Sequence, residues 1–276
     1  MLENGSKPAD LLPQVLEIAR RAGQAIMGIY ADFNPAVEYK KDDSPLTQAD
    51  LASHHIICDS LAALSPDIPV LSEEAAEVPF EVRRNWHLLW LVDPLDGTKE
   101  FLKRNGEFTV NIALMRDGAP VLGVVYAPAS DTAYFAVEGA GAYKSEQGSE
   151  KPIHASTGRN PAPKVVVSRW HGDGVDKMQA DLARIGVDHA RCEFVPMGSS
   201  LKFCMVAEGR ADLYLRNGPT MEWDTAAAQC VLEMAGGSVS DLDGNPLKYN
   251  KPVLRNPNFL AAATRLIPLP VEALSK

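Results

Sequence analysis

The sequence has no long apolar run and no secretory signal. The 276 residues contain no uninterrupted stretch of the roughly 20 apolar residues that a membrane-spanning helix needs. Its first ten residues, MLENGSKPAD, lack the basic-then-apolar order of a signal peptide. We therefore predict a cytoplasmic protein without a transmembrane segment. Peripheral attachment to the inner membrane is the alternative if the chain is bacterial.

Paired cysteines and an excess of positive charge are also missing. The four cysteines are scattered and form no C-x-x-C pair, so they predict reduced core residues rather than a zinc or disulfide framework. The net charge of −9, from 36 acids and 27 bases, argues against nucleic-acid binding, because a phosphate backbone would be repelled. A small anionic ligand remains compatible, since a bound metal ion reverses the local sign of charge.

Hydrophobic periodicity divides the chain into two halves. The first half predicts helices over 10–31 and 47–64, then strands over 87–93, 108–115, 121–128 and 132–139, the last three as an antiparallel meander. Residues 140–163 turn polar and rich in Gly, Ser and Pro, which indicates a boundary. The segments 164–169, 173–185, 198–209, 211–216 and 225–236 then alternate strand and helix. We predict an α+β half over 1–160 and an α/β half over 161–276.

The most informative segment is WLVDPLDGTKEF, residues 90–101. A predicted strand delivers Asp93, Pro94 is expected to turn the chain out of the sheet, and Asp96 follows. Two carboxylates just past a strand end can converge on one hard cation, with the Leu95 carbonyl as a further oxygen ligand. The N–H groups of Gly97 and Thr98 are expected at a helix start, where an anion is favoured. The alternative is that both aspartates only cap a turn and a helix.

Three further acids have the same character. Glu73 directly follows a short apolar run, Asp224 precedes an alanine-rich helix, and Asp50 lies in the first turn of the second helix. Taken singly, each has an ordinary explanation. Asp224 could be a simple helix N-cap, and the helix dipole alone favours Asp50 in a first turn.

Taken together and in order, these motifs resemble a known family. LTQAD around Asp50, SEE around Glu73, the DPLDGTKEF run and the WD pair at 223–224 are similar to the lithium-sensitive, magnesium-dependent phosphatase superfamily that includes inositol monophosphatase. The tripeptide KEF at 99–101 and GSSLKFC at 198–204 most resemble its CysQ-type 3′(2′),5′-bisphosphate nucleotidase branch. The resemblance implies a layered α-β-α-β-α sandwich, of mixed α+β and α/β class.

The resemblance also implies a set of site residues. The ligands of two or three Mg²⁺ ions, with Li⁺ as an inhibitor, would be Glu73, Asp93, the Leu95 carbonyl, Asp96 and Asp224. The catalytic residues would be Asp50, Thr98 and Glu73, with Thr98 and Asp50 orienting and deprotonating the attacking water. The substrate would be bound by Leu95, Asp96, Gly97, Thr98, His171, Ser199, Lys202, Arg216 and Asp224.

The predicted function is hydrolysis of the 3′-phosphate of 3′-phosphoadenosine 5′-phosphate, with the phosphosulfate analogue as a second substrate. That activity would connect the enzyme to sulfur metabolism. One alternative is an inositol or other sugar monophosphatase on the same fold. Another is a nucleotide-binding sensor without catalysis. A homodimer is among the assemblies open to the chain.

Overall fold

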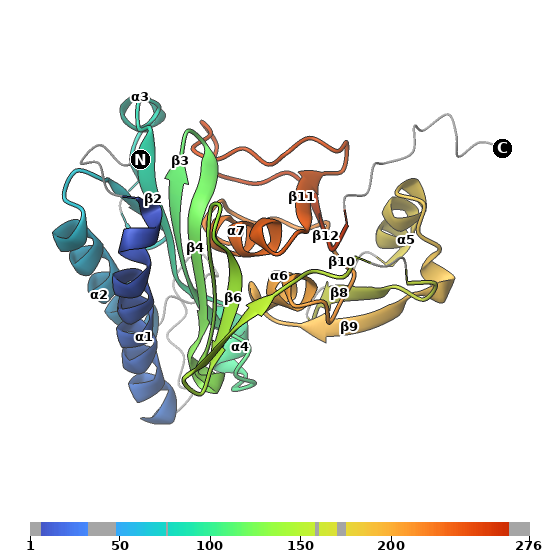
Figure 1. Ribbon diagram of the computed structural model, residues 1–276, viewed down its shortest axis with the longest axis horizontal. Coiled ribbons are helices and arrows are strands. Elements are labelled where there is room, and N and C mark those ends of the chain that lie inside the picture. Colours follow the sequence, from blue (N-terminus) through green and yellow to red (C-terminus); the bar gives the residue numbers. More distant parts are fainter. Residues whose placement is uncertain (1–6, 33–47, 76, 158–159, 170–174, 265–276) are drawn as a thin grey trace.

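Helices and sheets alternate in five layers (Figure 1). The computed structural model describes residues 7–32, 48–75, 77–157, 160–169 and 175–264. The layers run from α1 (Pro8–Asp32) and α2 (Gln48–Leu64), through a seven-stranded sheet, to α6 (Leu201–Ala207) and α7 (Ala226–Met234). A five-stranded sheet and α5 (Val175–Arg184) follow. The predicted α-β-α-β-α sandwich is therefore confirmed.

The first sheet has the strand order β1-β2-β3-β4-β5-β6-β7. Its strands are β1 (Val70–Ser72), β2 (Leu88–Asp96), β3 (Thr109–Arg116), β4 (Ala119–Ala127), β5 (Thr132–Val137), β6 (Gly141–Glu146) and β7 (Ser149–Ile153). Within it, only β1 and β2 pair in parallel. Trp90 and Val92 of β2 pack in the core that contains α1 and α2, whereas Leu89 and Leu91 pack in the core that contains α7. Because helices cover both faces, this strand is apolar at successive positions.

The second sheet has the strand order β11-β12-β10-β8-β9. Its strands are β8 (Lys164–Ser168), β9 (Glu193–Met197), β10 (Leu213–Arg216), β11 (Ser238–Asp241) and β12 (Phe259–Ala262). Leu182 near the end of α5, and Ile185 just beyond it, pack with Val165 and Leu213 of the sheet. The predicted segments 198–209 and 225–236 contain the helices α6 and α7 between the two sheets.

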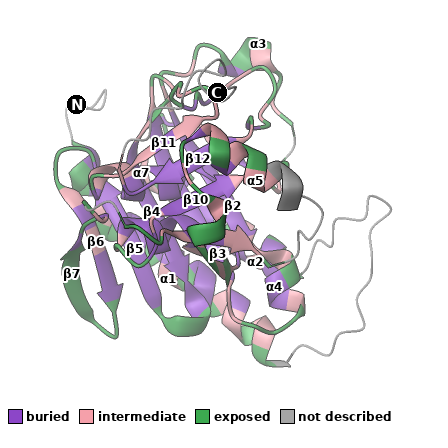
Figure 2. Cartoon of the chain, turned by 90° about the vertical axis from the view of Figure 1, so that its right-hand side faces the viewer, coloured by how far each residue is buried: buried purple, intermediate pink, exposed green. Residues whose placement is uncertain are grey.

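Two segments differ from the expectation. The polar segment 140–163, in which the sequence placed a boundary, begins with two strands that were not predicted, β6 and β7, which extend the first sheet. Figure 2 shows that β7 is largely exposed, which explains its polar composition. Pro94 does not take the chain out of the sheet either. Strand β2 continues to Asp96 across a bulge between Asp93 and Asp96, where a proline without an N–H is tolerated.

The division into 1–160 and 161–276 stays a prediction. The first sheet occupies residues within 70–153 and the second residues within 164–262, with α6 and α7 packed between them. Two short helices, α3 (Phe80–Arg83) and α4 (Thr98–Leu102), lie in connections of the first half. Among the described residues, no helix is both long and apolar enough to cross a bilayer.

Strand β4 and helix α7 approach each other at Gly123. A Cβ atom added there would lie 2.3 Å from the Ala227 carbonyl oxygen and 2.8 Å from the Cys230 Cβ. The nearest contact is helix backbone, which cannot rotate away. This position therefore needs a residue without a side chain, and it fixes the spacing between the first sheet and the helix that follows Asp224.

We expect Gly123→Ala to lower the free energy of unfolding by about 1–3 kcal/mol, because the added methyl group overpacks the core. Gly28 of α1 is a matched control, since nothing lies within 4 Å of its added Cβ. Gly28→Ala should raise stability by about 0.4–1 kcal/mol by restricting the unfolded chain. Urea unfolding measures both changes, and equal effects of the two substitutions would contradict the packing argument.

Candidate active site

Three acids from distant segments converge on one point. Glu73 follows β1, Asp93 lies in β2, and Asp224 precedes α7. One carboxylate oxygen from each lies within 4.8 Å of the others. Opposite oxygen ligands of one Mg²⁺ are about 4.2 Å apart, twice its bond length, so small side-chain rotations would let all three bind one ion. The predicted gathering of Glu73, Asp93 and Asp224 is present.

Burial and mutual repulsion make this cluster electrostatically unfavourable. Burial, followed by the charges of Glu73, Asp96, Asp224 and Asp50, raises the pKa of Asp93 well above its usual range. Glu73 is exposed as a whole residue, but desolvation of its carboxylate, followed by the charges of Glu74 and Asp96, raises its pKa to about 7. Burial, and then the charge of Asp96, raises the pKa of Asp224 well above its usual range. Divalent cations would relieve this repulsion, so the donor set fits magnesium.

The bulge of β2 is held by contacts with its own side chains and with α2. The Leu95 amide donates to Asp93 Oδ1 at 3.0 Å, and Ser53 Oγ donates to the Pro94 carbonyl at 2.8 Å. Ser53 and Asp50 are both buried on α2, where one helical turn separates them. The same helix therefore anchors the bulge and brings the Asp50 carboxylate towards Asp93.

Gly97 and Thr98 continue from this bulge into α4. Gly97 has φ of +94°, and a Cβ there would lie 3.2 Å from the Glu107 carbonyl oxygen. Glycine is favoured because L residues rarely adopt this conformation. Thr98 is the first residue of α4 and is partly exposed. The assignment of a water-activating role to Thr98 and Asp50 stays a prediction.

A cavity of about 130 Å³ adjoins the acid cluster. Of the predicted substrate residues, it is lined by Asp96, Gly97, Ser199, Lys202, Arg216 and Asp224. Leu95 and Thr98 do not line it, and His171 lies outside the described residues. Ser199 has φ of +44°, an unfavourable left-handed conformation for a residue with a side chain. Such strain commonly occurs at ligand sites.

Two cations, Lys202 and Arg216, line this cavity together with Asp96 and Asp224, and we call the two pairs the cation wall and the acid wall. Lys202 is 7% exposed, and its pKa is lowered chiefly by burial. Its Nζ lies 5.5 Å from the Tyr214 ring centroid and makes no ion pair within the described part of the chain. Arg216 donates to the Pro219 carbonyl at 3.1 Å, while its Nε is buried without a hydrogen-bond partner. A buried lysine and a partly exposed arginine, neither of which pairs with an acid among the described residues, favour binding of an anion.

Sequence reasoning missed a polar connection between the acids. Asn111 Nδ2 donates to Ser200 Oγ at 3.0 Å and lies 3.5 Å from Asp96 Oδ2. Ser200 Oγ donates in turn to the Asp224 carbonyl at 2.8 Å. The signal that the sequence offered was Asn111, an amide side chain inside the apolar run FTVNIALM.

A second missed residue is Glu222, which is fully buried. Its carboxylate accepts from the Asn250 amide at 2.6 Å, the Lys251 amide at 3.0 Å and Lys251 Nζ at 2.6 Å. The same turn places Asp224, whose Oδ2 accepts from the Met221 amide at 2.8 Å. Glu222 thus fixes the loop that contains Asp224. In the sequence, the feature that could have indicated this role is its position directly before the Trp223–Asp224 pair.

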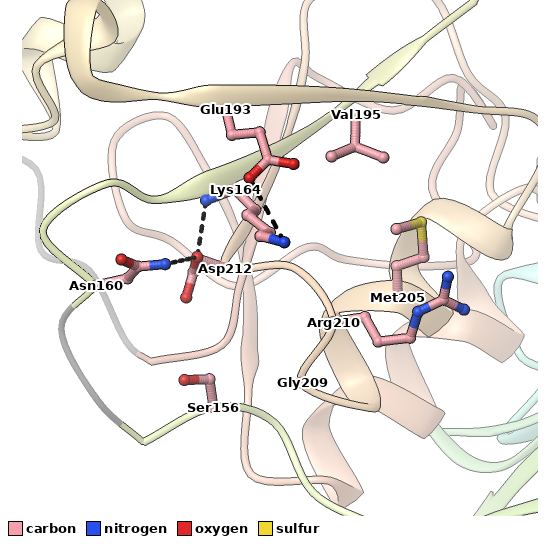
Figure 3. Close-up of a pocket in the computed structure, with 9 residues that line it drawn as sticks. All are labelled: Ser156, Asn160, Lys164, Glu193, Val195, Met205, Gly209, Arg210 and Asp212. Atoms are coloured by element: carbon pink, nitrogen blue, oxygen red, sulfur yellow. Dashed lines mark hydrogen bonds and ion pairs between the residues drawn. The ribbon is translucent and has the colours of Figure 1, made fainter.

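A larger cavity of about 570 Å³ has different chemistry (Figure 3). Its charged residues pair with one another or with neighbours. Lys164 Nζ lies 3.5 Å from Glu193, the Lys164 amide donates to Asp212 at 2.8 Å, and Arg210 pairs with Glu208 at 3.0 Å. None of the predicted site residues that the structure describes lines it. The smaller cavity beside the acid cluster is therefore the candidate active site.

A sequence model of the inositol monophosphatase family matches residues 8–274. The chain belongs to this family. It is 51% identical over 252 residues to the 3′(2′),5′-bisphosphate nucleotidase CysQ of Salmonella typhimurium, covering 90% of this chain and 98% of that protein. The protein of the same name from Haemophilus influenzae is 40% identical, over 91% of each chain.

Solved structures agree with this placement in the inositol monophosphatase family. The crystal structure of CysQ from Bacteroides thetaiotaomicron is similar, with a TM-score of 0.77, 42% identity and coverage of 90% of this chain and 95% of that one. An inositol monophosphatase from Anabaena has a TM-score of 0.73 and 26% identity, over 93% and 92% of the two chains. The higher identity to CysQ proteins agrees with the CysQ-type resemblance of the KEF and GSSLKFC motifs.

We expect the stability of the metal-free protein to fall as pH rises from about 4.5 to 7, the interval between the ordinary and the raised pKa of Glu73. In this window the folded state binds more protons than the unfolded state, so raising the pH favours unfolding. Magnesium needs the deprotonated carboxylates, so its stabilising effect should grow over the same window. Melting temperatures between about pH 5 and 8, in a chelator and in Mg²⁺, measure both trends.

Asp93→Asn is the control for this measurement, because it removes one charge from the cluster while keeping its shape. The fall in the chelator should become shallower in this variant. Identical pH profiles with and without magnesium would count against the acid cluster as a metal site.

Proposed function

We propose that this chain is a phosphoric monoester hydrolase that removes the 3′-phosphate from 3′-phosphoadenosine 5′-phosphate, giving AMP and phosphate. The phosphosulfate analogue is the second substrate. The observation that carries the proposal is one cavity lined both by the acids Asp96 and Asp224 and by the cations Lys202 and Arg216. Once bound magnesium neutralises the acids, a substrate with two anionic groups suits both pairs at once, and the similar CysQ proteins are named as 3′(2′),5′-bisphosphate nucleotidases.

In this proposal the metal ligands are Glu73, Asp93, the Leu95 carbonyl, Asp96 and Asp224, holding two or three magnesium ions. The raised pKa values of Glu73, Asp93 and Asp224 support this set, because the metal-free cluster is repulsive. Bound magnesium would lower the pKa of a water molecule and neutralise charge on the leaving oxygen. Lithium would inhibit by replacing one magnesium.

Thr98 orients the attacking water and Asp50 takes its proton through the threonine hydroxyl. A hydroxyl is too weak a base at neutral pH to keep that proton, so a carboxylate must follow it. Asp50 is buried, and its charge contributes to the raised pKa of Asp93, which supports a position of Asp50 beside the cluster. Glu73 is the third catalytic residue, as a ligand next to the same water.

The far wall binds the nucleotide and its second phosphate. Lys202 and Arg216 supply positive charge, and Ser199 supplies a hydroxyl. His171 belongs to the proposed set, although it lies outside the described residues. The phosphate that is removed is contacted by Leu95, Asp96, Gly97, Thr98 and Asp224.

An inositol or other sugar monophosphatase is the second candidate, favoured by the shared fold with the Anabaena enzyme. This function would give Lys202 and Arg216 no second anionic group to bind. A nucleotide sensor would need neither the repulsive acid cluster nor a water-activating pair. A role in sulfur metabolism, cytoplasmic location and a homodimer stay predictions, and sedimentation of the purified chain tests the last.

A phosphate-release panel tests the function. We expect turnover of 3′-phosphoadenosine 5′-phosphate to exceed that of inositol 1-phosphate, to require Mg²⁺ and to fall in millimolar lithium. Faster turnover of the inositol ester would favour the second candidate. Nucleotide binding without phosphate release at any magnesium concentration would favour the sensor.

Substitutions on the two walls should separate chemistry from specificity. Asp96→Asn removes a ligand charge and keeps the shape, so we expect it to abolish turnover of every substrate. Lys202→Met should lower kcat/KM for the bisphosphate by about 10- to 100-fold, the value of lost hydrogen bonds to a charged group. Turnover of a simple aryl monophosphate should change little. Equal loss for both substrates in Lys202→Met would place this lysine outside the specificity wall.

A further inference from the structure

Glu107 connects three segments beside the active site. It lies between α4 and β3, and its Oε2 accepts from the Gly198 amide at 2.8 Å and from Arg169 Nε at 2.6 Å. Its Oε1 accepts from Arg169 Nη2 at 2.5 Å. The partners are 62 and 91 residues away along the chain. A two-point arginine–carboxylate contact fixes orientation as well as distance.

The backbone of Gly198 is pressed against the same segment. A Cβ at Gly198 would lie 2.5 Å from Glu100 Cγ, 2.6 Å from the Glu107 carbonyl oxygen and 2.8 Å from Glu107 Cβ. The Glu107 carbonyl oxygen also lies 3.2 Å from the corresponding position on Gly97. Glu107 therefore lies between Gly97, which follows Asp96 at the end of β2, and the turn that carries Ser199.

The turn held by Glu107 leads directly into the cation wall. Ser199, which follows Gly198, has a left-handed backbone that must be held by its surroundings. Helix α6 begins two residues later, and Lys202 is its second residue. The position of the Gly198 amide thus sets the position of Ser199 and Lys202 relative to Asp96.

Arg169 connects Glu107 to a second segment that lines the cavity. It directly follows Ser168, which ends β8 and lines the cavity. The side chain of Arg169 is 33% exposed and that of Glu107 is 17% exposed, so the pair lies near the surface rather than in the core. Its position beside cavity-lining residues favours a role in substrate placement.

We propose that Glu107 is a positioning residue for substrate specificity, which holds the Ser199–Lys202 segment at a fixed distance from the metal ligands. This inference rests on the proposed function and deepens it. If the Gly198 amide were released, Ser199 and Lys202 could move away from the acid wall. A substrate that uses both walls would then be bound poorly, while a substrate that uses only the acid wall would be affected far less.

The test compares two substrates in the wild type and four variants. Three variants change the proposed contact: Glu107→Ala, Glu107→Gln and Arg169→Ala. The fourth, Arg116→Ala, is a control. The quantity measured in Mg²⁺ is the ratio of kcat/KM for 3′-phosphoadenosine 5′-phosphate to kcat/KM for 4-nitrophenyl phosphate.

The control removes a similar ion pair away from the cavity. Arg116 Nη2 lies 2.5 Å from Glu138 Oε2, and both side chains are partly exposed. Arg116 is the last residue of β3, at the opposite end of the strand from Thr109, which pairs with Asp96. Loss of this pair therefore tests whether any surface ion pair on the first sheet alters the ratio.

We expect Glu107→Ala to lower the ratio by at least about tenfold, mainly through KM for the bisphosphate, since misplacement by about 1 Å can cost 100-fold. Glu107→Gln keeps an acceptor for the Gly198 amide and should retain more of the ratio. Arg169→Ala should lower it less than Glu107→Ala, and Arg116→Ala should leave it unchanged. Equal losses for the two substrates in Glu107→Ala would overturn the inference and leave only a structural role.

Hydrogen exchange of the metal-free protein is the second readout. Peptides covering 198–207 should exchange faster in Glu107→Ala than in the wild type, while those from α1 should not change. Unchanged exchange at 198–207 would also overturn the inference. A wild-type protein that releases no phosphate from the bisphosphate would refute the proposed function instead, and exchange would then decide whether Glu107 holds this segment.

Discussion

The repulsion among clustered carboxylates is the constraint on which the site depends. Glu73, Asp93 and Asp224 would separate in a flexible chain, because the charges of the cluster raise the pKa of its members. Their convergence therefore requires contacts with residues outside the cluster that hold the acids in place. Asp93 is fixed by the β2 bulge, which Ser53 of α2 anchors through the Pro94 carbonyl. Contacts from outside the cluster thus offset the unfavourable free energy of repulsion within it. A site of this kind makes the metal-free protein less stable and gives it affinity for cations.

The sequence predicted the layers well, because the signals that define them are local. Helical periodicity and short apolar runs located α1, α2, α6, α7 and the strands β2 to β5, β8 and β10 to within a few residues, but not β9, β11 and β12 of the second sheet. β7 was missed because an exposed edge strand carries polar residues that resemble a linker. β6 was missed because it carries Lys144 and Ser145, which are polar although the sheet buries them. The bulge at Pro94 was missed because proline alone does not distinguish a strand end from an interruption within a strand.

The candidate site was predictable in a different way. The acids came from motif order and resemblance to a family, and the structure brings Glu73, Asp93 and Asp224 together. The supporting residues could not be assigned, because their partners lie far away in sequence and only the folded chain defines them; they are Asn111, Ser200 and Glu222. Residues that support a site are thus harder to identify from sequence than residues that perform its chemistry.

The two walls of the cavity also affect each other. Burial and the nearby Arg216 lower the pKa of Lys202, while Asp96, Glu100 and Asp224 oppose that effect. In the metal-free protein the acids therefore help to keep Lys202 charged. Cations bound to the acids would cancel much of that support and leave the buried Lys202, beside Arg216, in need of an anion. Under the proposed function the second phosphate of the substrate supplies it, so metal and nucleotide each improve the site for the other.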